Sequence, residues 1–268
     1  MKAHLSIKYG AFLATAAVFL IVMAPAGWAQ GEFDELRVLI EINATDGDAG
    51  FQAKGDAEGW EEVRIDNPEG RKIFDVKAFD GLSEQGLTEV FFESEEPSCD
   101  ELPLLAFLER FVAGEYLWTG KTENGGKLEG EAILTHLLPS APMITAPDEG
   151  QILDPSQPVV VTWQEGEGLG ECDPGDAFDI MEPEALFGFQ IVVEREEPAP
   201  LMVLSIDVPS DATALTIPPE FLQEEGIYKI EVVAIEARGV GEEMERGNQT
   251  ISESFFCTTG IANCVLPE

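Results

Sequence analysis

The chain has 268 residues, of which 52 are acidic and 15 basic, giving a formal net charge of −37 at 44% hydrophobic content. This apolar content is enough for a packed core and excludes a disordered acidic tail. A surface this negative repels phosphate groups, so the sequence predicts no nucleic-acid partner and no attraction to anionic membranes.

Residues 1–29 have the features of a secretory signal peptide. Lys2 and Lys8 precede an apolar run that ends near Ala24, and Ala26 and Ala29 offer small-residue cleavage sites. The run is shorter than the ~20 apolar residues that a membrane span needs, and no later run is longer. We therefore predict a secreted protein, extracellular or periplasmic, without a membrane span.

Alternation of apolar and polar residues dominates residues 30–139, which we predict to form an Ig-like β-sandwich domain. In the first strand Leu36, Val38, Ile40 and Ile42 would face the core. Further strands are expected at residues 62–65, 72–79, 88–92, 115–121 and 128–135, the last two joined by a turn at residues 124–126.

One short helix interrupts this pattern. Leu104, Leu108 and Phe111 recur at helical spacing between a capping residue, Ser98 or Asp100, and a terminating Gly114.

Prolines at 139, 142 and 147 indicate a semi-rigid linker, and we place a second domain at residues 140–268. Its strands alternate in the same way, which makes the whole chain all-β with two sandwiches. The strand Tyr228-Lys229-Ile230-Glu231-Val232-Val233-Ala234, a strand tryptophan at Trp163 and Leu215 ahead of the tyrosine strand resemble the fibronectin type III family over residues 142–257. The resemblance implies a fibronectin type III-like sandwich and no particular activity.

Four cysteines in an exported chain favour two disulfides, for which three pairings exist. Cys257 and Cys264 lie close in sequence, so we prefer a local bridge there and a second bridge between Cys99 and Cys172.

Two acidic segments are candidate calcium sites, because calcium takes six to eight oxygen ligands. One is the turn after the first strand and the other is the long loop at residues 164–186. The alternatives are an Asx-and-glycine turn and a solvated acidic loop, respectively. The candidate ligands are Asp46 and Asp48 in the first segment and Asp173, Asp176 and Asp179 in the second.

No residue pattern singles out a catalytic centre. His136 is the one histidine outside the signal peptide, and no pair of carboxylates is marked by spacing. Trp60 in an acidic loop and Trp118 on the hairpin strand are candidate exposed binding anchors, and the alternative is core or edge packing, which a strand tryptophan favours. Asn43 and Asn248 begin glycosylation sequons.

We therefore predict a secreted, non-catalytic recognition or structural module whose partner is a protein, a cell surface or an extracellular polymer. The alternatives are a carboxylate-based hydrolase of extracellular polymer and a calcium-dependent assembly subunit.

Overall fold

The computed structural model describes residues 30–175, 182–239 and 244–267, and it is mainly β, with two sheets and a few short helices. In chain order the elements are β1 (Gln30–Glu32), β2 (Glu35–Asn43), β3 (Asp48–Asp66), β4 (Lys72–Lys77), α1 (Gly81–Gln85), β5 (Leu87–Glu93), α2 (Leu104–Arg110), β6 (Gly114–Thr122), β7 (Lys127–Leu134), β8 (Met143–Ala146), β9 (Gln151–Leu153), β10 (Val159–Gln164), the 3₁₀ turn Gly170–Cys172, β11 (Leu186–Glu197), β12 (Met202–Pro209), β13 (Ala214–Ile217), the 3₁₀ turn Pro219–Phe221, β14 (Ile227–Arg238) and β15 (Glu245–Thr258).

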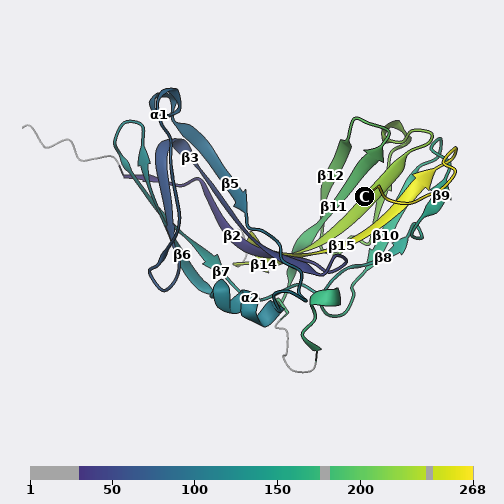
Figure 1. The fold of residues 1–268 in the computed structure, drawn as a ribbon, viewed down its shortest axis with the longest axis horizontal. Coiled ribbons are helices and arrows are strands. Elements are labelled where there is room, and N and C mark those ends of the chain that lie inside the picture. Colours follow the sequence, from purple (N-terminus) through teal and green to yellow (C-terminus); the bar gives the residue numbers. More distant parts are fainter. Residues whose placement is uncertain (1–29, 176–181, 240–243, 268) are drawn as a thin grey trace, which may run out of the picture.

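The larger sheet runs through both halves of the chain, in the order β1-β7-β6-β3-β2-β15-β14-β11-β12. The halves are joined where β2 pairs in parallel with β15, with Glu41 opposite Gln249 and Asn43 opposite Ile251. In Figure 1 two groups of strands diverge from this junction, and we call them the N-terminal and C-terminal lobes. The smaller sheet, β13-β10-β8, covers the core of the C-terminal lobe.

Each lobe has its own hydrophobic core. The N-terminal core holds the alternating residues Val38, Ile40 and Ile42 of β2 together with the rings of Trp60 and Trp118. The long strand β3 supplies residues to this core along its length, pairing first with β2 and β5 and then with β4 and β6. At Gly55 a Cβ would lie 2.7 Å from the Trp118 ring, so only glycine lets this ring pack against the strand.

The C-terminal core contains alternating residues of β10, β11, β13 and β14. The inward residues include Val161 and Trp163 on β10, Ile191 on β11 and Tyr228 on β14. The Tyr228 ring stacks on Phe256 at 4.9 Å, and its hydroxyl accepts a hydrogen bond from the Gln223 amide. Leu215 is only half-buried.

The helix prediction is confirmed for α2, but its start is not where the sequence placed it. The residue before the helix is Pro103, while Ser98 Oγ accepts a hydrogen bond from the Glu101 amide in the preceding turn. The interpretation of Trp60 as an exposed anchor is wrong, because β3 continues through it and leaves the side chain 2% exposed in the core.

Both predicted disulfides are present, Cys99–Cys172 and Cys257–Cys264. The first bridge anchors the 164–186 loop to the N-terminal lobe. Leu169 of this loop is fully buried in the N-terminal core, and the Glu171 amide donates to the Ala44 carbonyl. The division into domains at residue 139/140 stays a prediction. In the structure, Leu169 lies beyond this boundary in sequence but packs in the core of the N-terminal lobe.

Candidate functional site

A buried cluster of hydrogen-bonded polar residues connects the two lobes. Glu236, 0% exposed, accepts hydrogen bonds from the Thr135 hydroxyl (2.7 Å), Arg238 Nε (3.0 Å) and the Asn248 amide (2.7 Å). Arg238 also donates to the carbonyls of Val38 and Ile133 in the N-terminal lobe. Because strands of both lobes contribute to one hydrogen-bonded unit, the lobes hold each other in place.

Asn248 completes this cluster. Its side-chain amide donates to the carbonyls of Thr135 and Leu137, and its Oδ1 accepts from the Ile40 amide. The residue is 0% exposed. The Asn248 sequon is therefore closed to glycosylation in the folded protein.

A groove lies between the lobes beside this junction. It consists of three adjoining hollows of about 560, 240 and 350 Å³, which we call the outer, middle and acidic hollows. The outer and middle hollows share Arg37 and Arg246, and the middle and acidic hollows share Gln190 and Gln249. The residues of β2 that alternate with its core face, Arg37, Leu39 and Glu41, line this groove.

Carboxylates dominate the lining of the groove. Among the described residues, twelve acidic ones line the three hollows against four basic ones, which are Arg37, Lys54, Lys229 and Arg246. Each basic group already has an acidic partner, such as Glu35 for Lys54 at 2.9 Å and Asp207 for Arg246 at 2.8 Å. The groove therefore has a large excess of negative charge.

Carboxylates that the sequence did not connect meet at the acidic hollow, whose lining includes Glu41 and Glu96. Oxygen atoms of Glu41, Glu93 and Glu96 lie within 4.8 Å of one another. The pKa of both Glu41 and Glu96 is raised to about 7. The larger cause is desolvation of the carboxyl group, and the negative charge of Glu93 adds to it. Glu96 nevertheless keeps an exposed surface. Burial also raises the pKa of Asp48.

The predicted calcium ligands are divided by the fold. Asp46 and Asp48 line the acidic hollow, whereas Asp173 is not part of its lining and accepts a hydrogen bond from the Gly175 amide. Asp176 and Asp179 lie outside the described residues. Calcium binding stays a prediction, which a calorimetric calcium titration of the oxidised protein tests.

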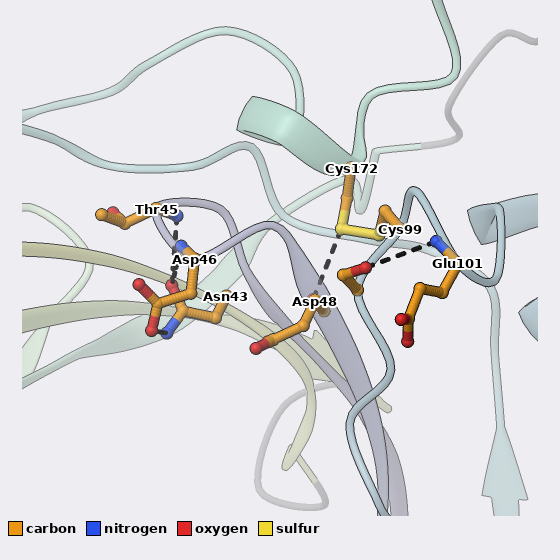
Figure 2. The surroundings of a disulfide bond; sticks show 8 residues. Asn43, Thr45, Asp46, Asp48, Cys99, Glu101 and Cys172 are labelled. Carbon is orange, nitrogen blue, oxygen red and sulfur yellow. Dashed lines mark hydrogen bonds between the residues drawn. A yellow bond between two sulfur atoms is a disulfide. The ribbon is translucent and has the colours of Figure 1, made fainter.

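The turn that holds Asp46 and Asp48 is an Asx turn, as the alternative interpretation expects. Asn43 Oδ1 accepts hydrogen bonds from the amides of Thr45 and Asp46, and Gly47 adopts a positive φ of 71°. Figure 2 shows this turn beside the Cys99–Cys172 bridge, with Cys172 Sγ 3.4 Å from the Asp48 carbonyl oxygen. The disulfide thus positions the rim of the acidic hollow.

Glu41 and Glu96 had no distinguishing signal in the sequence. Glu41 is one polar position in an alternating strand, and Glu96 is one acid in an acidic stretch. The pairing of β3 with both β2 and β5 brings them together, because Glu41 lies opposite Gly50 on β3 and the chain after β5 places Glu96 against the same glycine. A hollow with carboxyls of raised pKa can exchange protons near neutral pH, but the described residues that line it include no aromatic side chain on which a sugar would stack.

Protonation of Glu41 should make stability depend on pH. The folded state holds the Glu41 proton up to about pH 7, whereas the unfolded chain loses it near pH 4.5. We expect the free energy of unfolding to fall as pH rises through this window, by at most about 3 kcal/mol from Glu41, and then to level off. Urea unfolding midpoints at pH 5 and pH 8 measure this effect.

Glu41→Gln should reduce this pH dependence, because glutamine does not ionise, while Glu96, whose pKa is also raised to about 7, keeps its own contribution. Glu115→Gln, on the exposed face of β6, is the matched control and should keep the wild-type slope. An unchanged slope in the Glu41→Gln variant would contradict the assignment.

Among the described residues, no helix is long and apolar enough to cross a membrane. His136 Nε2 lies 2.8 Å from the Phe111 carbonyl oxygen, which is a structural contact.

Comparison with known proteins finds structural neighbours only. No protein-family model and no curated protein matches the chain. The fibronectin(III)-like modules of Clostridium thermocellum CbhA align with 88% of this chain and 98% of their own at 9% identity and a TM-score of 0.29. A 1.5-MDa bacterial ice-binding adhesin aligns with 87% of this chain and 66% of its own at 11% identity and a TM-score of 0.27. The FN1-FN3 domains of chicken CNTN1 align with 85% and 68% at 10% identity and a TM-score of 0.28. These TM-scores lie below 0.5, so the description of the fold rests on the strand pairing and cores given above.

Proposed function

We propose that this protein is a secreted, non-catalytic recognition module that binds a partner protein in the groove between its lobes. The proposal includes an Ig-like sandwich at residues 30–139 and a fibronectin type III-like sandwich at residues 140–268. The two disulfides support an oxidising compartment, because such bonds persist outside the cytosol.

The observation that carries the proposal is that hydrogen bonds and strand pairing hold the two lobes together at their junction. Glu236, Arg238 and Asn248 bind groups of the N-terminal lobe, and β2 pairs directly with β15. The groove walls are therefore held at a fixed spacing before any partner arrives. A preformed surface avoids the entropy cost of ordering on association, which favours a role in binding.

A site-specific photo-crosslinker tests this function. p-Benzoylphenylalanine in place of Phe187, which lines the outer hollow, should yield a covalent adduct with one partner protein when the cells that secrete the chain are irradiated. The same group in place of Glu224, an exposed residue outside the groove, is the control. Equal adducts from both positions, or none from position 187, would contradict binding in the groove.

Assembly through strand edges is the second candidate, and β12 favours it. This strand ends the larger sheet, and residues 199–206 carry no charged side chain in a chain that is 25% charged. Leu201, Met202 and Val203 are more than 45% exposed there. An uncharged open edge is a template for pairing with another strand.

A further inference from the structure

We propose that the partner segment in the outer hollow is an extended peptide that carries lysine or arginine residues separated by apolar residues. This inference rests on the proposed function and names the chemistry of its partner. The outer hollow has a volume of about 560 Å³ and is formed by both lobes, with Phe187 and Met244 contributed by the C-terminal lobe.

The charge of the outer hollow favours a basic segment. Glu32, Asp34 and Glu131 are exposed on its N-terminal wall, and no basic group of the described chain forms an ion pair with them. The two basic residues of the hollow, Arg37 and Arg246, are already paired with Glu35 and Asp207. Lysine or arginine from a partner would therefore meet carboxylates that have no competing partner within the described chain.

Apolar surface on the opposite wall favours apolar residues between the basic ones. Phe187 is 38% exposed and Met244 is 43% exposed, so both have ring or thioether surface available for contact. The Arg246 guanidinium lies over one face of the Phe187 ring, 5.8 Å from its centroid, and this contact holds the ring in place. In an extended segment successive side chains point to opposite sides, so basic and apolar residues would face the two walls.

The probe is a labelled nine-residue peptide that alternates lysine and valine, with both ends capped, at 150 mM NaCl. Two comparison peptides replace every lysine by glutamate or every valine by serine. We expect the lysine-valine peptide to bind at least about tenfold more tightly than the serine peptide, and the glutamate peptide not to bind. Fluorescence anisotropy measures all three.

Matched variants separate the groove from the general negative charge of the molecule. Glu32→Gln, Asp34→Asn and Glu131→Gln combined should weaken binding at least about tenfold. Glu149→Gln, Glu220→Gln and Glu224→Gln combined remove the same charge from exposed positions outside the groove and should change the dissociation constant less than about twofold. The double variant Phe187→Ser/Met244→Ser should bind the lysine-valine peptide only as tightly as it binds the serine peptide.

Equal weakening by the two triple variants would overturn the proposal, since it would show attraction to overall charge alone. Absence of peptide binding would also overturn it. If the crosslinker at position 187 still captured one partner, the proposed function would stand with a partner of different chemistry. If the crosslinker at position 187 also gave no adduct, both the proposed function and the peptide inference would be wrong.

Discussion

Arg238→Met should lower the free energy of unfolding by about 3–5 kcal/mol, because it leaves the Glu236 carboxylate buried without its ion-pair partner. The Glu236 side chain is 1% exposed and that of Arg238 is 11% exposed, so water cannot replace the lost guanidinium without opening the junction. The carbonyls of Val38 and Ile133 lose a donor in the same substitution. Urea denaturation followed by tryptophan fluorescence measures the loss.

Two further variants make this test specific. Arg71→Met removes an ion pair with Glu69 in which both side chains are more than half exposed, and it should cause no measurable loss. Glu236→Gln combined with Arg238→Met should recover part of the stability, because glutamine keeps a hydrogen-bonding group for Thr135 without a buried charge. A loss below about 1 kcal/mol in Arg238→Met would show that the junction is not held by this cluster.

Removing the Cys99–Cys172 bridge should destabilise the protein more than removing the Cys257–Cys264 bridge. The first joins residues 73 apart in sequence and the second joins residues 7 apart. A disulfide lowers the entropy of the unfolded chain, and this effect grows with the length of the loop that it closes. The expected loss in the free energy of unfolding is therefore about 4 kcal/mol for the first bridge and about 2.5 kcal/mol for the second. Paired cysteine-to-alanine variants, compared by urea denaturation, measure both losses.

The first bridge should also have a local effect. Without it, the loop that carries Leu169 is anchored by the core contact of that side chain and by hydrogen bonds such as Glu171 to Ala44. Hydrogen exchange at the Glu171 amide should therefore accelerate in the Cys99→Ala/Cys172→Ala variant and not in the Cys257→Ala/Cys264→Ala variant. Equal losses of stability from the two bridges, or exchange that does not change, would contradict this role.

Local patterns predicted strands such as β2 because one face of the strand is buried in the core and the other is not. The alternation of Val38, Ile40 and Ile42, and of Tyr228, Ile230 and Val232, depends on backbone geometry and on solvent, both of which act within a few residues. The same reasoning failed at Trp60, where an acidic composition suggested a loop. Pairing of β3 with β5 and β6 outweighed that local composition.

The sequence by itself determined the mainly β class, the core faces of strands such as β2 and β14, the presence of the helix α2 and the preferred disulfide pairing. Only the tertiary structure decided that β2 and β15 join the lobes in one sheet, that Glu236, Arg238 and Asn248 form a buried cluster, and that carboxylate oxygens of Glu41, Glu93 and Glu96 lie within 4.8 Å of one another. The reason is the range of the interactions. Burial of alternate side chains is a property of a short segment, whereas these contacts join residues up to about 200 positions apart, and local patterns contain no information about which distant strands will pair.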